Sequence, residues 1–106
     1  VVTAAAFSLL HRELLIGLTA RLRLPAIYWS RIFPATGGLM SYGPDSAALH
    51  RQSAGYIDRI LRGEAPANLP VQEATRFETV INARTVRALG LVVPPGLALE
   101  ADETIE

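Results

Sequence analysis

The stretch Gly37-Gly38-Leu39-Met40-Ser41-Tyr42-Gly43-Pro44-Asp45 decides the fold of this 106-residue chain, together with the helix that follows it. Its residues come in the order of a strand, a tight turn and a helix start. In an open α/β sheet, small ligands bind beyond the carboxyl ends of the strands, where backbone N–H groups and helix dipoles converge. The sequence therefore predicts that Tyr42, Gly43 and Asp45 lie at such an edge.

The segment before this stretch predicts a helix, a strand and a short helix. Ser8 is the expected N-cap of the first helix, and Leu24-Pro25 ends it. Residues 26–29 are short and apolar, which is typical of a buried parallel strand. Ser30 then caps one or two helical turns, and a second short strand follows over residues 39–42. The apolar positions of the first helix are Leu10, Leu14, Leu15, Leu18 and Leu22.

The segment after the stretch predicts a long helix that runs to Leu61-Arg62-Gly63, where Gly63 provides a left-handed stop. Its apolar face and its charged face are distinct. The apolar face contains Leu49, Tyr56, Ile57, Ile60 and Leu61. Gly55 lies inside this helix, where glycine costs about 1 kcal/mol relative to alanine, so we expect close packing on the sheet to explain it.

The C-terminal third predicts one more strand and one more helix. Residues 76–81 alternate as a strand does, and Asn82 is the expected cap of a helix over residues 83–89. A last short turn begins at Pro94-Pro95. The acidic tail frays unless another strand pairs with Thr104-Ile105.

This alternation of helices and strands predicts an α/β fold with a partial parallel sheet flanked by helices. Three short strands make a smaller sheet than a doubly wound domain normally has. The chain is therefore expected to be one segment, residues 1–106, of a larger architecture.

Composition narrows the possible functions. Half of the residues are hydrophobic, so one modest core is possible, and ten arginines balance ten acidic residues without gathering into a stripe. Nucleic acid is therefore not an expected partner. No cysteine is present, which excludes disulfides, thiolate catalysis and cysteine-based zinc sites. No apolar run approaches the roughly 20 residues of a membrane helix.

The N-terminal end carries no recognisable targeting pattern. Residues 1–10 are apolar, but they lack the basic region and the cleavage pattern of a signal peptide. The chain also lacks an initiator methionine, which suggests a processed or truncated polypeptide.

Gly38 and Gly43 have the spacing of a phosphate-binding loop. That motif needs lysine and serine or threonine where this chain has Pro44-Asp45, so a nucleoside triphosphate site is excluded. The two glycines also suit a plain sharp turn, and Asp45 also suits an ordinary helix cap.

Three aromatic residues fall at or near the carboxyl ends of predicted strands. Tyr42 is expected at the edge of a cleft, where an aromatic ring stacks on a ligand. Trp29 suits the same edge because its indole N–H needs a partner, whereas Tyr28 fits the core equally well.

No residue of the chain predicts catalysis. His11 and His50 are expected on polar helix faces, without a second ligand at metal spacing and without a nucleophile beside them. The carboxylates are dispersed, so no acid–base pair is expected. The sequence predicts no enzyme, no metal site and no cofactor.

Several blocks in a fixed order carry a resemblance to a known family. The blocks are Arg23-Leu24-Pro25-Ala26-Ile27-Tyr28, Gly37 to Pro44, Tyr56 to Gly63 with Pro66 and Leu69-Pro70-Val71, Phe77 to Asn82, and Ala88-Leu89-Gly90-Leu91 with Pro94-Pro95. Together they resemble the C-terminal end of ABC-transporter substrate-binding proteins of the tryptophan/tyrosine-binding-like group. The resemblance spans nearly the whole chain.

The resemblance implies a type I periplasmic binding protein fold, in which two α/β lobes close over a solute and deliver it to a membrane permease. It implies that this chain is the last third of such a protein, with parts of both lobes. Ser41-Tyr42-Gly43 then form one wall of the solute cleft, with Asp45 beside them, and Tyr28-Trp29 form another. An amino acid or a similar small molecule is the implied solute, and the periplasm the implied location.

The chain departs from the family pattern at two places. Ala74 stands where proline is expected, and Trp29-Ser30-Arg31 differs from the usual residues after the Tyr28 block. The second departure lies at the implied pocket and bears on the identity of the solute. Unpaired strand edges of a truncated sheet also predict self-association into a homo-oligomer.

Other classes of function fit parts of the pattern. A sensor domain of the same fold would follow a DNA-binding helix-turn-helix. An α/β enzyme fragment would need a nucleophile, base or metal cluster. A plain interaction module would assemble through its exposed sheet edge.

Overall fold

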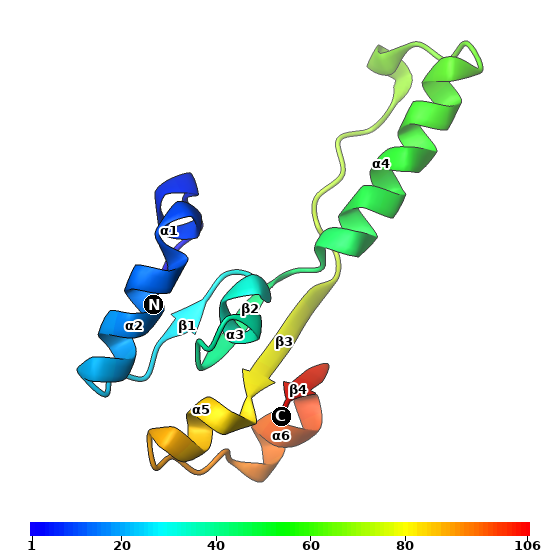
Figure 1. Cartoon of the computed structure of the whole chain (residues 1–106). Helices are drawn as coiled ribbons and strands as arrows, with labels where there is room; N and C mark the ends of the chain where they lie inside the picture. The colour runs from blue at the N-terminus through cyan, green and yellow to red at the C-terminus, as the bar shows by residue number, and fades with distance from the viewer. The chain divides into compact units, whose positions relative to one another are not determined.

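A computed structural model describes all 106 residues of the chain. The chain forms two compact units, which are considered separately: unit 1 contains Val1–Gly43 and Glu78–Glu106, and unit 2 contains Pro44–Phe77. Figure 1 follows the chain from its N-terminus to its C-terminus. The chain leaves unit 1 after Gly43 and returns to it after Phe77.

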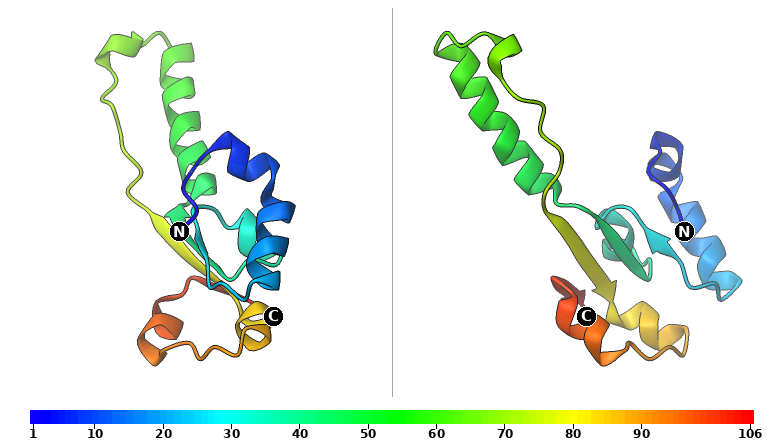
Figure 2. Two further views of the ribbon diagram at one scale, coloured as in Figure 1. Left: turned by 90° about the vertical axis from the view of Figure 1, so that its left-hand side faces the viewer. Right: turned by 180° about the vertical axis from the view of Figure 1, so that it is seen from behind.

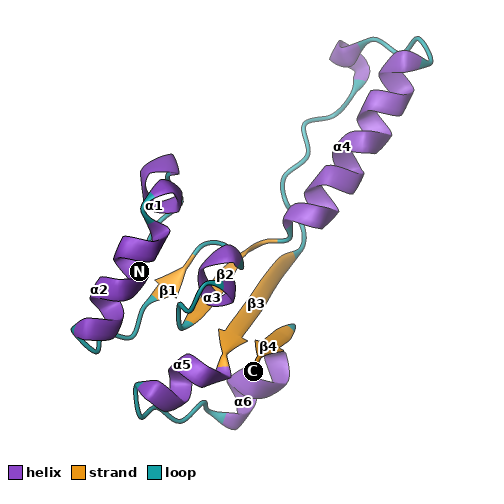
Figure 3. Cartoon of the chain, in the orientation of Figure 1, coloured by secondary structure: helices purple, strands orange, loops and turns teal.

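Four strands form one sheet in the order β1-β2-β3-β4 (Figure 3). They are β1 (Ile27–Tyr28), β2 (Met40–Pro44), β3 (Phe77–Asn82) and β4 (Glu103–Ile105). The pairs β1–β2 and β3–β4 are parallel. The central pair is antiparallel, because the Asn82 N–H donates to the Leu39 carbonyl (2.9 Å) and the Asp45 N–H donates to the Arg76 carbonyl (3.0 Å).

The predicted α/β class is confirmed, but the sheet has four strands where three were predicted, and it is mixed rather than parallel, since only β1–β2 and β3–β4 pair in the parallel sense. The reason lies between β2 and β3. The segment that follows the long helix runs back along it, so β3 starts at the end of β2 that the chain has just left. A strand that starts there can only pair with β2 in the antiparallel sense.

The N-terminal helices α1 (Ala6–Leu10) and α2 (Arg12–Arg21) and the short α3 (Ile32–Ala35) enclose the core of unit 1. Ile16 of α2 packs there with Tyr28 and Phe33, whose rings stack with centroids 4.6 Å apart. The predicted Ser8 cap is wrong: the helix begins before Ser8, which is buried and donates to the Ala5 carbonyl (2.8 Å).

The C-terminal part adds α5 (Ala83–Ala88), α6 (Pro95–Glu100) and β4. The predicted cap of α5 is confirmed, since Asn82 Oδ1 accepts from the Thr85 N–H (3.1 Å). The expected turn at Pro94-Pro95 extends into α6. The tail does not fray, because Thr104 and Ile105 pair with the end of β3.

Unit 2 consists of α4 (Ser46–Leu61), the 3₁₀ turn η1 (Pro66–Asn68) and an extended return segment, shown from two further sides in Figure 2. Asp45 caps α4, and Gly63 has φ = +103° just beyond it, as the sequence predicts. The Tyr56 hydroxyl donates to the Pro70 carbonyl of the return segment. No residue of unit 2 is buried.

The expected packing role of Gly55 is wrong. Nothing lies within 4 Å of the position that a β-carbon at Gly55 would occupy, so no neighbouring backbone requires glycine there.

None of the helices combines the length and the apolar composition that crossing a membrane requires.

Candidate functional site at the strand ends

One edge of the sheet in unit 1 gathers the residues that the sequence singles out. β1 and β2 are parallel and end at this edge, and the antiparallel β3 begins there, as does β4 beside it. Side chains and backbone from four strands therefore converge at one place. We call this region the strand-end edge; it contains Trp29, Arg31, Ser41, Tyr42, Gly43, Glu78 and Glu103.

Trp29 and Gly43 form the closest approach within the strand-end edge. A β-carbon added to Gly43 would lie 1.9 Å from the Trp29 carbonyl oxygen, a distance that no side chain tolerates. Glycine is therefore required so that β2 can pass the backbone after β1. The indole of Trp29 is partly buried, and its Nε1 lies 3.4 Å from Ser8 Oγ. The two predicted site residues thus meet directly.

Tyr28 belongs to the core rather than to an open surface. It is fully buried against Phe33, and its hydroxyl lies 3.1 Å from Thr19 Oγ1. The sequence allowed Tyr28 either at the edge of the cleft or in the core, and its burial agrees with the core. Its contribution to the strand-end edge is to position the residues after it.

Ser41 and Tyr42 lie on opposite faces of β2, because successive side chains of a strand alternate. Ser41 is 1% exposed, and its hydroxyl has no hydrogen-bond partner. Tyr42 is 58% exposed. A buried hydroxyl without a partner costs about 1–3 kcal/mol and needs an explanation, such as a donor or acceptor role toward a bound molecule.

Asp45 belongs to unit 2, where it caps α4. Its Oδ1 accepts from the Ala48 N–H (3.0 Å), and its Oδ2 lies 3.3 Å from Arg76 Nε. The hydrogen bond from Ala48 lowers the pKa of the Asp45 carboxyl below its ordinary value, with a further contribution from Ala47 and the Arg76 charge. The carboxylate therefore acts as a helix cap.

An ion pair at the strand-end edge was not expected from the sequence. Arg31 Nη2 donates to both carboxylate oxygens of Glu103, at 2.9 and 2.6 Å. The hydrogen bond and the charge of Glu103 raise the pKa of the Arg31 guanidinium, and the Glu78 charge adds to this. In the sequence, only the acidic character of the tail pointed toward an ion pair. Arg31 could not be named as the partner of Glu103, because the pairing of the tail with β3 was not predicted.

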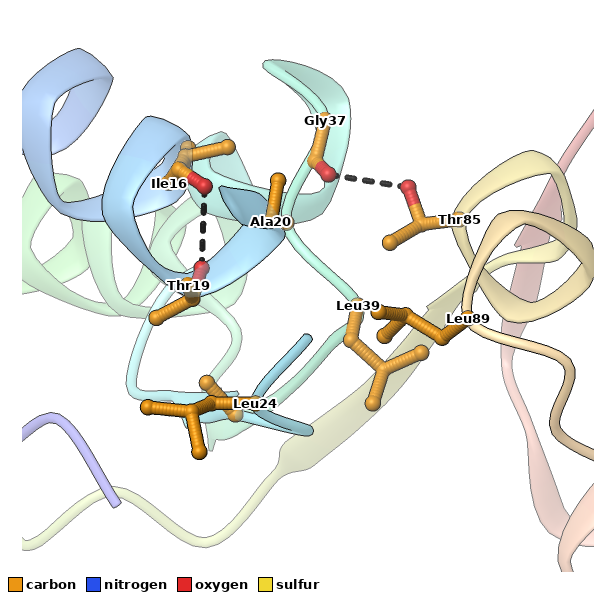
Figure 4. A pocket seen from close by; sticks show the side chains of 10 residues that line it. Ile16, Thr19, Ala20, Leu24, Gly37, Leu39, Thr85 and Leu89 are labelled. Atoms are coloured by element: carbon orange, nitrogen blue, oxygen red, sulfur yellow. Dashed lines mark hydrogen bonds between the residues drawn. The ribbon is translucent and has the colours of Figure 1, made fainter. Parts of the chain in front are cut away.

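The small cavity in Figure 4 lies at the opposite end of the sheet, where β2 begins. Ile16, Thr19 and Ala20 of α2 line one side of it, and Thr85 of α5 donates to the Gly37 carbonyl (2.8 Å) on the other. Its volume is about 10 Å³, which accommodates about one water molecule. It is too small for an organic ligand, and none of the residues that line it belongs to the strand-end edge.

Comparisons with known proteins give a consistent result. Residues 8–105 match the family profile described as ABC transporter substrate binding protein. No match was found among curated proteins.

Solved structures share the fold of the chain. A conserved domain protein from Vibrio cholerae O1 biovar El Tor is 27% identical, with a TM-score of 0.84 over 92% of this chain. An ABC domain from Streptococcus pneumoniae, in complex with L-Trp, is 22% identical, with a TM-score of 0.88 over 97% of this chain. The ligand-free, open structure of CD0873, a substrate binding protein with adhesive properties from Clostridium difficile, is 16% identical, with a TM-score of 0.62 over 93%.

The chain spans about a third of the length of these proteins: 33%, 35% and 33%, respectively. The family profile covers nearly every residue from α1 to β4. The chain therefore belongs to the ABC transporter substrate binding protein family, and it corresponds to a fragment of the solved structures that it resembles.

Proposed function

We propose that this chain is part of the solute-binding component of an ABC transporter, and that the strand-end edge of unit 1 forms one wall of the solute cleft. The observation that carries this proposal is the family match over residues 8–105. The solute is an amino acid or a similar small organic molecule, which is bound without being altered. The L-Trp complex of the Streptococcus pneumoniae domain supports this class of solute.

The chemistry of the strand-end edge supports the proposal. Tyr42 offers an exposed ring on which a flat or apolar solute group stacks. On the opposite face of β2, the buried Ser41 hydroxyl has a donor and an acceptor that no residue of the chain uses. Trp29 lies with its backbone against Gly43, and its indole lies near Ser8 and Phe33. A few polar groups among aromatic side chains are the usual composition of a small-molecule site.

The division of the chain supports a two-lobed parent protein. The chain crosses between units 1 and 2 twice, after Gly43 and after Phe77. We propose that unit 1 belongs to one lobe and unit 2 to the other, and that the lobes close over the solute by rotating about these crossings. Outside the cytoplasmic membrane, solute binding then selects the closed state, which the ABC permease in that membrane recognises.

The test is calorimetry on the full-length protein with L-tryptophan and a panel of other amino acids. Tyr42→Ala is expected to weaken binding of the preferred solute about tenfold, because a stacking surface is lost. Ser41→Ala is expected to weaken it while leaving the thermal unfolding temperature the same or higher, because the hydroxyl has no partner within the protein.

The matched control is Val92→Ala, which also truncates an exposed side chain of unit 1 but lies away from the strand-end edge. It is expected to leave the affinity unchanged. Unchanged affinity in Tyr42→Ala and Ser41→Ala as well would remove this edge from the solute cleft. Absence of binding for every solute in the panel would count against an amino acid as the ligand class.

A further inference from the structure

The ion pair between Arg31 and Glu103 joins the two outermost strands of the sheet. Arg31 follows β1 and Glu103 begins β4, while β2 and β3 lie between them (Figure 3). The contact is bidentate at the carboxylate, because Arg31 Nη2 lies 2.9 Å from one oxygen of Glu103 and 2.6 Å from the other. The pair therefore connects the two sides of the strand-end edge.

The Glu103 side of this connection is fixed without Arg31. The Asp102 N–H donates to the Thr79 carbonyl (2.9 Å), and the Thr79 N–H donates to Asp102 Oδ2 (2.8 Å). Glu103 itself lies in parallel register with Val80. The start of β4 is thus attached to β3 by its own hydrogen bonds, and Glu103 is a fixed anchor for the guanidinium.

The Arg31 side depends more on the ion pair. β1 has only two residues, and the loop Trp29-Ser30-Arg31 leads from it into α3. Within this loop the Ser30 carbonyl accepts from the Phe33 N–H (3.2 Å), and Ser30 Oγ lies 3.5 Å from the Ile32 nitrogen. These bonds form the turn into α3 and do not attach the loop to β3 or β4. The contact with Glu103 supplies that attachment.

The same loop presses on the end of β2. The Trp29 carbonyl oxygen would lie 1.9 Å from a β-carbon at Gly43, so there is no free space between the loop and β2. Gly43 directly follows Ser41 and Tyr42, the two proposed solute contacts. A shift of the loop is therefore passed on to these residues. Binding groups lose affinity when their supporting contacts let them move by less than an ångström.

We propose that Arg31 and Glu103 are positioning residues of the solute site: their ion pair holds the Trp29-Ser30-Arg31 loop against β2 and so fixes Ser41 and Tyr42 for binding. This proposal rests on the proposed function, because it assigns a role to two further residues of the same site. Neither residue needs to touch the solute.

Charge exchange in the full-length protein tests the pair. Arg31→Glu and Glu103→Arg each place like charges opposite one another, and we expect each to raise about fivefold the dissociation constant of the amino acid that binds best in the calorimetric panel. The double variant restores opposite charges and is expected to return to within about twofold of the original. The recovery stays incomplete because the Glu78 charge, which attracts Arg31, repels a carboxylate at that position.

Arg87→Glu is the matched control. Arg87 Nη1 lies 3.7 Å from Glu106 Oε2, and this exposed ion pair joins α5 to the residue after β4, outside the strand-end edge. Its loss is expected to leave the affinity unchanged. All of these variants are expected to unfold at nearly the original temperature, because exposed ion pairs contribute little to stability.

Fluorine NMR of the full-length protein labelled with fluorotryptophan reports on the loop without any solute. Trp29 is the only tryptophan of this chain, and Trp29→Phe assigns its resonance by removing it. We expect Arg31→Glu and Glu103→Arg to shift this resonance, the double variant to return it toward the original position, and Arg87→Glu to leave it in place.

The outcomes separate this proposal from the proposed function. A Trp29 resonance that does not move in the single variants overturns the positioning role. Weakened binding that the double variant does not recover also overturns it, because a direct contact with the solute would then explain the loss.

If the single variants bind as tightly as the original, Tyr42→Ala in the same series identifies which proposal fails. Weakened binding by Tyr42→Ala retains the solute site and overturns the role of Arg31 and Glu103 alone. Unchanged binding in all of these variants removes the strand-end edge from the solute cleft and overturns both proposals.

Discussion

At Gly43 the backbone of β2 passes so close to the Trp29 carbonyl that a single methyl group does not fit. We expect Gly43→Ala to lower the free energy of unfolding by about 1–3 kcal/mol, because the added β-carbon would lie 1.9 Å from a backbone oxygen that cannot move freely. Urea denaturation of unit 1, followed by Trp29 fluorescence, measures this loss.

Gly55→Ala is the contrasting substitution at the residue scale. Its β-carbon would meet nothing within 4 Å, and alanine favours a helix by about 1 kcal/mol relative to glycine. It is expected to raise the helicity measured by circular dichroism. For Gly43→Ala, a free energy of unfolding equal to that of the original chain would show that the close approach to the Trp29 carbonyl does not require glycine at position 43.

Asn82 joins two elements through one side chain. Its Nδ2 donates to the Pro34 carbonyl (2.8 Å), while its Oδ1 accepts from the Thr85 N–H. We expect Asn82→Ala to cost about 2–4 kcal/mol, because a buried carbonyl and a helix N–H both lose their partners. Asn82→Asp keeps the acceptor alone, so thermal unfolding is expected to place it between Asn82→Ala and the original. Identical melting of all three would contradict this role.

At the scale of the element, the cap of α4 makes its helicity depend on pH. The pKa of Asp45 in the folded chain lies below its ordinary value of 3.8, chiefly because of the hydrogen bond from the Ala48 N–H. A depressed pKa stabilises the folded form above the ordinary value. That stabilisation is lost as the pH falls below 3.8 and through the folded pKa.

We therefore expect the α4 helicity of the original chain to be constant above about pH 5 and to decrease in the acid range below it. Asp45→Asn keeps a capping oxygen without the charge, so part of this decrease is expected to disappear. Residue-resolved NMR chemical shifts of α4 across the titration measure both effects. If Asp45→Asn loses as much α4 helicity at acid pH as the original chain, the loss is caused by carboxylates other than Asp45.

At the scale of the whole chain, the two units differ in how much they bury. Unit 1 contains a core of fully buried side chains, including Phe33 and Val80, whereas no residue of unit 2 is buried. We expect amide hydrogens of α4 to exchange with solvent well before those of β3, because exposed helices open with little cost. Mass spectrometry of hydrogen exchange in the isolated chain measures the order.

Uniform exchange across α4 and β3 would contradict this difference. In the full-length protein, slower exchange of α4 than in the isolated chain would indicate that the rest of the protein covers its apolar residues, such as Ile57 and Leu61. Unchanged exchange there would mean that α4 is exposed in the parent as well.

The sequence by itself determined the features that depend on neighbours within about one helical turn. The caps Asp45 and Asn82 and the glycine stop at Gly63 all lie where the pattern predicts them. The cap at Ser8 was wrong, since the helix begins before it and its hydroxyl bonds backward to Ala5. Such signals act through one or two local hydrogen bonds, so the residues that carry them are enough to recognise them.

Only the tertiary structure decided the antiparallel centre of the sheet, the pairing of β4 with β3 and the contact between Arg31 and Glu103. It also decided that Ser41 is buried without a partner while the neighbouring Tyr42 is exposed. These features join residues that lie far apart in the chain or depend on which face of a strand is covered. Local propensity carries no information on either, because both are set by how the elements pack.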